Sequence, residues 1–334
     1  MKTPVLYHVV AYTSFIISFT ANILLIFLTK SRKLNKLGTY KHLITCFAFA
    51  SIFYSTCDVI YQPVIIAKIG GHITFCSSPV DLGSSAEYVG ALFAVNYGNT
   101  LLMIALHYIY RYFAVCNRHH LKWFRGCYFY AWIVAVLILD FLWFLGAFHL
   151  LRKTSASDEY LRSDMRDFYD EDISKVSYLT VLFKTEANGR VIYQRKSIVM
   201  IFFIILQQTI TLFIIIFCAA KTMITLRGCL ISKTAVNLQR KLFKMLLVQT
   251  GSPFILMYFS IVVLLIAPFY GYHVGSNSIY ISCALAIYPA TEPLIILYFL
   301  ADFKKSIANS FAPVLNLQKK SINSVSVRVR NHRF

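Results

Sequence analysis

The sequence predicts an all-α membrane protein folded as a bundle of seven transmembrane helices. The first observation is composition: of 334 residues, 58% are hydrophobic and 14% charged, whereas a soluble domain is roughly half apolar and a quarter charged. The second is a mean hydropathy of +0.62. The third is that seven stretches are long and apolar enough to cross a bilayer core about 30 Å thick, which takes about 20 helical residues.

The predicted spans share their length, their apolar composition and at most one charge each. In chain order they are residues 3–29, 42–67, 88–110, 126–151, 197–220, 245–268 and 279–301. The uncharged stretch 269–278 separates the last two. Because Gly271, Gly275 and Asn277 favour turns, we expect a short loop there.

Three carboxylates, Asp58, Asp140 and Glu292, lie inside predicted spans. A central aspartate costs about 2.5–3.5 kcal/mol on the insertion scale, and each Leu, Ile, Phe or Val returns about 0.3–0.6 kcal/mol. The span 126–151 has 14 of these apolar residues, so its insertion is still favoured. Asp58 and Asp140 are therefore functional candidates: one of them holds a cationic ligand, or both are protonated and hydrogen-bonded within the bundle.

Charge in the connecting segments predicts the orientation. The connections on one side, together with the C-terminal segment, carry 22 basic residues and one acidic residue, Asp302; the other side carries 11 basic and 10 acidic residues. Because cytoplasmic loops are rich in Lys and Arg, we expect the N-terminus outside and the C-terminus in the cytoplasm. Residues 1–308 are then the seven-transmembrane domain, and residues 309–334 are a basic cytoplasmic tail.

The third span ends in the motif Tyr110-Arg111-Tyr112. An arginine has five hydrogen-bond donors, and at this position it reaches either inward between helices or outward to a partner protein. The alternative is a simple anchor that extends its charge to the membrane surface. The sequence leaves both open.

Pro253 marks the sixth span. It removes a backbone hydrogen bond in mid-helix and predicts a kink, although proline is also simply tolerated in membrane helices. The segment before it is basic, with Arg240, Lys241 and Lys244. A helix that is kinked at Pro253 and carries these basic residues at its end could transmit a movement at the kink to that end.

In the seventh span, Pro289 and Pro293 flank Glu292. The prolines free nearby carbonyls, so the pattern predicts a deformable polar site in apolar surroundings. Residues 302–311 then predict a short amphipathic helix along the inner membrane surface, with its apolar side chains facing lipid.

These three stretches resemble the nematode serpentine chemoreceptors, most closely the Str type and its near relatives, which are G-protein-coupled receptors. The family pattern has Tyr-Arg-Tyr ending helix three, Leu-Phe-x-x-Leu-x-x-Gln-Thr-x-x-Pro in helix six and Tyr-Pro-x-x-acid-Pro-Leu in helix seven. Here the three motifs fall at residues 110–112, 242–253 and 288–294, with Glu292 where Asp is more common. The resemblance implies chemosensory signalling through heterotrimeric G proteins, at the membrane of sensory neurons and their cilia.

We therefore expect a small, odorant-like molecule to bind in the outer half of the bundle and to shift helices three, six and seven, which exposes a basic surface to a G protein. The expected coupling residues are Tyr110, Arg111, Tyr112, Arg240, Lys241, Lys244, Pro253, Pro289, Glu292 and Pro293. Ligand pockets combine apolar walls with a few polar groups. The candidates of that kind are Tyr88, Asn96, Asn99, Gln207, Gln208, Tyr258 and Tyr280, each of which has hydrogen bonding between helices as its alternative role.

The longest outer loop, residues 152–196, holds 17 charged residues and no cysteine. Residues 179–183 and 190–193, around an Asn-Gly pair, have the pattern of a β-hairpin, which is either a lid over the bundle or part of a solvated spacer. Only Cys76 lies clearly outside. A disulfide from helix three to this loop is excluded, and a bridge from Cys76 to Cys57 or Cys283 is the remaining possibility.

Other classes of function have little support. The sequence lacks phosphate-binding and nucleophile-elbow motifs and has no paired-cysteine metal spacing, so we expect no enzyme, metal or cofactor. The net charge of +19 does not indicate nucleic acid, because the charged residues are few and lie between apolar runs. A transporter or an ion channel is the alternative; a transporter predicts internal repeats, and the sequence shows none.

Overall fold

The computed structural model describes residues 5–30, 38–68, 70–170, 172–187, 190–228, 233–266, 270 and 278–300. Within these residues, seven helices are long and apolar enough to cross a membrane. They are α1 (Val5–Lys30), α2 (Tyr40–Tyr61), α3 (Ser85–Val115), α4 (Cys127–Leu150), α6 (Arg195–Gly228), the stretch Gln239–Leu264 and the helix Ser278–Leu300. The predicted number and order of spans are confirmed.

The sixth of these helices is composite. It begins as α7 (Lys233–Pro253), continues as the π-helical segment η4 (Phe254–Tyr258) and ends as α8 (Phe259–Ile266). Because Pro253 has no N–H, the carbonyl of Gln249 loses its α-helical partner, and the wider turn of η4 begins directly after the proline. The sequence predicted a kink at Pro253, and the structure has a π-helical turn directly after it.

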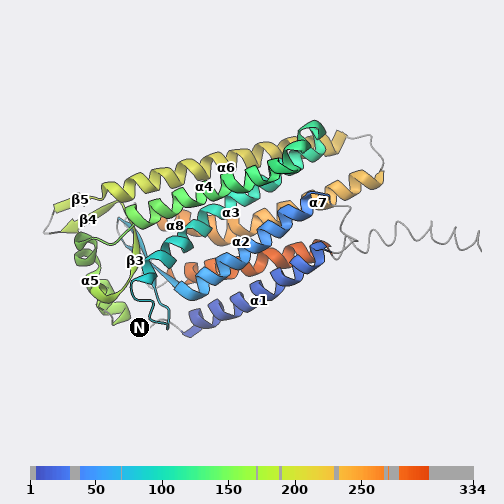
Figure 1. Cartoon of the computed structure of the whole chain (residues 1–334). Coiled ribbons are helices and arrows are strands. Elements are labelled where there is room, and N and C mark those ends of the chain that lie inside the picture. The colour runs from blue at the N-terminus through green and yellow to red at the C-terminus, as the bar shows by residue number, and fades with distance from the viewer. Residues whose placement is uncertain are drawn as a thin grey trace, which may run out of the picture.

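The long helices lie side by side, and the strands and α5 gather at one end of the bundle (Figure 1). We call that end the sheet end, and the opposite end the η2 end, after the short helix η2 (Arg118–Phe124) between α3 and α4. In α3, 67% of the membrane-crossing stretch is buried, against 11% in α4 and 17% in α6. Helix α3 is therefore the central helix, in contact with α2, α4, α6 and α7.

A three-stranded antiparallel sheet covers the sheet end. Its strands are β1 (Pro63–Lys68), β2 (Gly71–Cys76) and β3 (Tyr178–Leu182), with β2 in the centre. β1 and β2 form a hairpin in which Ile65 is paired with Thr74, and β3 adds to the other edge of β2, where Ile73 is paired with Thr180. The sheet thereby joins the connection between α2 and α3 to the long segment between α4 and α6.

Both faces of this sheet are buried. On the outer face, Ile73 and Phe75 pack with Leu161 and Met165 of α5 (Ser155–Tyr169). The N-terminus of α5 is held by a capping box, in which the Thr154 hydroxyl accepts from the Ser157 N–H at 3.2 Å. The other face turns toward the helices. The sheet is therefore a layer between α5 and the bundle.

The predicted second span was too long. Helix α2 ends at Tyr61, Gln62 adopts a left-handed φ of 47°, and Pro63 opens β1, so residues 62–67 belong to the connection and the sheet rather than to a helix. A strand buried on both faces is a continuous apolar run without alternation. The sequence Val-Ile-Ile-Ala at 64–67 is such a run, and it is indistinguishable from the end of an apolar helix by hydropathy alone.

The predicted hairpin of the long loop was partly wrong. The segment that pairs with β5 (Arg190–Tyr193) is β4 (Lys184–Ala187), with Ala187 opposite Arg190, whereas residues 178–182 pair with β2. The register fits a two-residue turn, although Asn188 and Gly189 themselves lie outside the described residues. The long loop is neither a simple lid nor a solvated spacer, since α5 and β3 are packed parts of the outer layer.

Several expectations fall outside the described part of the chain. These are most of the loop 269–278, the amphipathic helix 302–311 and the tail 309–334. Seven cysteines are described, and all seven are free thiols, Cys57, Cys76 and Cys283 among them. The bridge considered for Cys76 is therefore absent from the described chain.

Gly71 provides a test of the sheet. Its φ is +140°, and a Cβ there would stand 2.0 Å from the Val181 carbonyl oxygen on β3. We predict that Gly71→Ala destabilises the chain by about 3 kcal/mol through strain and overpacking. Gly83→Ala is the matched control, because Gly83 also has a positive φ but open space around it. Thermal unfolding of the purified chain in nanodiscs measures both, and equal shifts would contradict the assigned pairing of β2 with β3.

Candidate functional site

A cavity lies beneath the sheet, between it and the helices. It has a volume of about 90 Å³. Its walls come from the three strands and from α3, α4, α6 and the helix Ser278–Leu300: Ile65, His72, Thr74, Phe93, Ala94, Tyr97, Trp143, Leu151, Leu179, Val181, Ile201, Ile204, Ile205 and Leu285. We call it the sheet cavity. Apolar walls with a few polar groups are typical of small-molecule sites.

No charged side chain lines the sheet cavity. Its most polar group is His72, which is 7% exposed and whose Nδ1 has no hydrogen-bond partner in the described structure. Burial lowers the pKa of His72 to about 4, so the imidazole is neutral at physiological pH. The Trp143 indole N–H is already engaged, since it donates to Gln207 Oε1.

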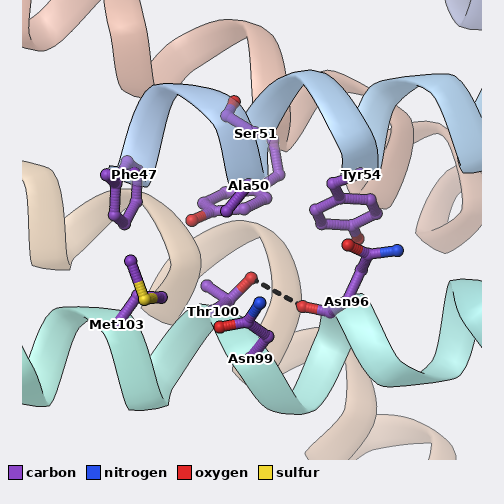
Figure 2. Close-up of a pocket in the computed structure, with 9 residues that line it drawn as sticks. Phe47, Ala50, Ser51, Tyr54, Asn96, Asn99, Thr100 and Met103 are labelled. Carbon is purple, nitrogen blue, oxygen red and sulfur yellow. Dashed lines mark hydrogen bonds between the residues drawn. The ribbon is translucent and has the colours of Figure 1, made fainter. Parts of the chain in front are cut away.

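A second, smaller cavity lies between α2 and α3, deeper in the bundle (Figure 2). Its volume of about 20 Å³ has room for about one water molecule. Asn96, Asn99 and Thr100 line it from α3, and Ser51 and Tyr54 line it from α2. Thr100 Oγ1 donates to the Asn96 carbonyl at 3.0 Å, and Asn99 Oδ1 has no partner in the described structure. We call it the polar cavity.

Glu292 lies next to this region and is 0% exposed. Gln249 Nε2 of α7 donates to its Oε2 at 2.9 Å, and the Tyr288 hydroxyl donates to its Oε1 at 2.9 Å. Among the described residues, no basic side chain forms an ion pair with it. Glu292 thus joins α7 to the helix Ser278–Leu300 through neutral hydrogen bonds.

The paired prolines of this helix explain a further contact. Pro293 has no N–H, so the carbonyl four residues earlier, at Pro289, lacks an α-helical partner. Ser51 Oγ of α2 donates to that carbonyl at 3.1 Å, and Asn22 Nδ2 of α1 donates to Ser51 Oγ at 3.1 Å. A backbone group freed by proline is thus satisfied by neighbouring helices, as a membrane interior demands.

At the η2 end, Arg111 points inward and is 2% exposed. Its Nη1 donates to Gln239 Oε1 of α7 at 3.0 Å, and its guanidinium carbon lies 3.9 Å from the centre of the Tyr40 ring. Nε and Nη2 have no partner in the described structure. The side chain is therefore held between helices by neutral groups, and the interpretation of Arg111 as an anchor at the membrane surface does not fit this geometry.

The neighbours of Arg111 have different surroundings. Tyr110 stacks on Tyr40 with ring centres 5.3 Å apart, and Tyr112 packs against Phe217 of α6 at 5.9 Å. On α7, Arg240 Nη2 donates to the Leu226 carbonyl of α6 at 2.9 Å, which links the two helices near the same end. Lys241 is half-buried and Lys244 is exposed.

Aromatic contacts connect the sheet cavity to the irregular part of the sixth helix. Tyr97, in the wall of the cavity, lies 6.5 Å from Trp143 and 5.6 Å from Tyr258, measured between ring centres. Tyr258 is the last residue of η4. A molecule in the cavity would therefore touch a side chain that packs directly on the π-helical turn after Pro253.

Comparison with known proteins decides the family. The family described as Serpentine type 7TM GPCR chemoreceptor Str matches residues 7–308. This chain belongs to that family. It is 27% identical over 316 residues to the Caenorhabditis briggsae protein named Serpentine receptor class r-10, covering 92% of this chain and 90% of that one. It is 26% identical over 310 residues to G-protein coupled receptor str-33 of Caenorhabditis elegans, covering 90% of each chain.

A solved structure agrees on the fold. Squid rhodopsin superimposes with a TM-score of 0.57 and 15% sequence identity, over 94% of this chain and 88% of that chain. The Str chemoreceptor therefore has the seven-helix fold of a G-protein-coupled receptor and is a multi-pass membrane protein. Members of this family are receptors rather than enzymes, as the sequence predicted.

The structure places the predicted ligand residues in three different surroundings. Asn96 and Asn99 line the polar cavity, Gln207 holds Trp143, and Tyr258 lies against Tyr97. Tyr88 and Tyr280 are 52% and 66% exposed and line neither cavity. Gln208 is half-buried, and both its amide atoms lack partners among the described residues.

The two other acids inside the spans, Asp58 and half-buried Asp140, lie on different helices. Asp58 is buried in α2, and its Oδ1 has no partner in the described structure. Asp140 lines a groove between α2, α3 and α4 together with Asn99. The proposed alternatives for these aspartates therefore stay open.

Sequence reasoning missed the residues that the sheet contributes. His72 and Thr74 were placed in a short outer connection with no expected structure, and Tyr97 and Trp143 were taken as ordinary span residues. The signal available was local: the apolar run at 64–67 and the alternating segment His72-Ile73-Thr74-Phe75 flank Gly70-Gly71, which is a hairpin pattern. Gln249 was seen only as part of a motif, although a buried carboxyl such as Glu292 needs a donor.

Replacing Glu292 tests its role as a joint between helices. We predict that Glu292→Ala lowers the free energy of unfolding by about 3 kcal/mol or more, because Gln249 and Tyr288 lose their acceptor inside the bundle. Glu292→Gln keeps one acceptor oxygen and costs less. Glu87→Ala is the control, since Glu87 forms a half-exposed ion pair with Arg152 at 2.8 Å, worth about 0–1 kcal/mol. Equal losses of thermal stability for Glu292→Ala and Glu87→Ala would contradict this role.

His72 predicts a dependence of stability on pH. Its pKa is about 4 in the fold and about 6.5 when unfolded, so the unfolded chain binds the extra proton between these values. Stability is lost as the pH falls from about 6.5 toward 4, by about 3 kcal/mol in all. We predict that His72→Phe removes this part of the dependence. Thermal unfolding of both chains at neutral and acidic pH measures it, and parallel pH profiles would show that His72 is not buried as a neutral group.

Proposed function

We propose that this Str chemoreceptor binds a small odorant-like molecule in the sheet cavity and activates a heterotrimeric G protein at its η2 end. The observation that carries the proposal is the pairing of two features on α3. Tyr97 lines the cavity, and Arg111, about 21 Å further along the same helix at 1.5 Å per residue, is buried against α7. Charge in the connections supports a sheet end outside the cell and a cytoplasmic η2 end.

The inner contact of Arg111 is suited to a switch. A buried guanidinium with one hydrogen bond and two unpartnered groups is costly to keep. A small outward movement of α7 would remove Gln239 and leave Arg111 free to bind a carbonyl or carboxylate of a partner protein. The same movement would present Arg240 and Lys244, which lie on α7 near Gln239.

Proline geometry provides the place where α7 would move. The turn after Pro253 is already π-helical, and it contacts the wall of the sheet cavity through Tyr258. Glu292 and Gln249 join α7 to the helix Ser278–Leu300 just below that turn. A ligand that displaces Tyr97 would therefore act on η4 above this joint, and α7 would respond below it. A receptor switch requires an element with two discrete arrangements, and we propose that the sixth helix, with η4 and α7, is this element.

The family relationship supports the physiological setting. The relatives are named as serpentine and G-protein-coupled receptors of nematodes. We propose that the chain lies in the membrane of a sensory neuron, at its cilium, where it meets ligands from the surroundings. Immunolocalisation of the full chain in the animal checks this setting.

Arg111 provides the test of coupling. We predict that Arg111→Ala abolishes ligand-evoked G-protein activation while surface expression stays normal, because the guanidinium that would bind the partner protein once α7 moves is missing. Arg118→Ala is the matched control, since Arg118 is exposed in η2 at the same end and should leave signalling within about twofold. Calcium or cyclic-nucleotide signals in cells expressing each variant measure the effect.

Two results would contradict the proposal. An unchanged response in Arg111→Ala would remove this residue from the mechanism. Ion currents or substrate uptake by the reconstituted chain in vesicles without any G protein would favour the alternative, a channel or a transporter.

A further inference from the structure

We propose that the sheet cavity selects an uncharged, mostly apolar molecule with one carbonyl or hydroxyl oxygen, and that His72 Nδ1 is the group that recognises this oxygen. The inference rests on the proposed function for the idea that a ligand enters this cavity. It adds a chemical class for the ligand and a specificity residue on a strand outside the helix bundle.

The position of His72 is set by the sheet. It lies on the central strand β2, opposite Ala67 of β1 and Val181 of β3. Because side chains alternate along a strand, His72 and Thr74 face the cavity, while Ile73 and Phe75 face α5. The α5 layer covers the outer face, so the strand is held from both sides. The imidazole is therefore a buried part of the cavity wall, and the pairing of β2 on both edges fixes the position of its backbone.

One polar atom of a residue in this wall has no hydrogen-bond partner. Among the residues that line the cavity, His72 is the one with a buried side-chain nitrogen or oxygen atom that has no partner in the described structure, and that atom is Nδ1. A buried polar atom without a partner costs about 1–3 kcal/mol. An oxygen atom on a bound molecule would satisfy it, either by accepting from Nδ1–H or by donating to the Nδ1 lone pair, depending on the tautomer.

The lining also argues against a charged ligand. The cavity has no acidic or basic side chain to pair with an ion, and moving an unpaired ion out of water costs several kcal/mol even after relaxation. The neutral imidazole does not supply a charge. Eleven of the fourteen lining residues are apolar or tryptophan, so the rest of the ligand should be hydrocarbon.

Matched probes on one carbon skeleton test the inference: heptane, heptanol, dipropyl ketone, heptylammonium and heptanoate. Binding is measured as the thermal shift of the full chain in nanodiscs. We predict that the ketone or the alcohol stabilises the chain more than heptane does, and that neither ion stabilises it. His72→Phe keeps the ring and removes both nitrogens, and it should reduce the affinity for the oxygen-bearing probe about tenfold, to the level of heptane.

Two further variants keep the result interpretable. His72→Asn places an amide near the position of Nδ1, so it should restore part of the preference for oxygen; this rescue would show that loss in His72→Phe is not a folding defect. His149→Phe is the matched control, because His149 is an exposed histidine on α4 outside the cavity, and it should bind like the natural chain.

The outcomes separate this inference from the proposed function. It is overturned if no neutral probe binds, if an ion binds best, or if His72→Phe keeps the full preference for oxygen. Binding that depends on His72 but never stimulates nucleotide exchange on a G protein would support the inference and contradict the proposed coupling. Exchange driven by a probe whose effect ignores His72 would support coupling and overturn the inference.

Discussion

Polar groups inside a bilayer need partners from the protein itself, and the architecture of this Str chemoreceptor follows from that constraint. Glu292 has no counter-ion among the described residues and is satisfied by Gln249 and Tyr288. The carbonyl that Pro293 frees is satisfied by Ser51. Arg111 has Gln239 and the face of Tyr40. Each partner comes from another helix or from the next turn of the same helix. The few hydrogen bonds of the interior are therefore also the contacts that join helices and that break when helices separate.

The sheet end is subject to the same rule outside the spans. The strands β1–β3 satisfy one another's backbone groups, and both faces of the sheet are buried, one on α5 and one over the helices. The result is a mostly apolar cavity whose wall includes the buried histidine His72. Helix α3 runs from this cavity, through the polar cavity, to Arg111. The sheet cavity and the contact of Arg111 with Gln239 therefore both involve the central helix α3. This helix is the physical path of the proposed signal.

Much of the fold could be predicted because hydropathy and charge act at the scale of whole helices. Seven spans were confirmed in number and order, and the family resemblance came from motifs around Arg111, Pro253 and Glu292. The sheet was missed because a strand buried on both faces has the composition of a helix end; residues 62–67 were assigned to the second span for that reason. The Gly70-Gly71 pair was the local sequence signal that contradicted this assignment. The hydrogen-bond partners of Arg111 and Glu292, which are Gln239 and Gln249, depend on how the helices pack. The periodicity of a single sequence does not contain this information.

The central claim is that a molecule in the sheet cavity moves α7 away from α3 at the η2 end. The most direct measurement is the distance between spin labels at the exposed positions of Arg118 and Lys244, introduced through unnatural amino acids and measured by pulsed electron paramagnetic resonance in nanodiscs. The compound used is one that stabilises the natural chain but not the His72→Phe chain. The account predicts a shift of the distance distribution to longer values in the natural chain and none in His72→Phe. An unchanged distribution at saturating compound would contradict it.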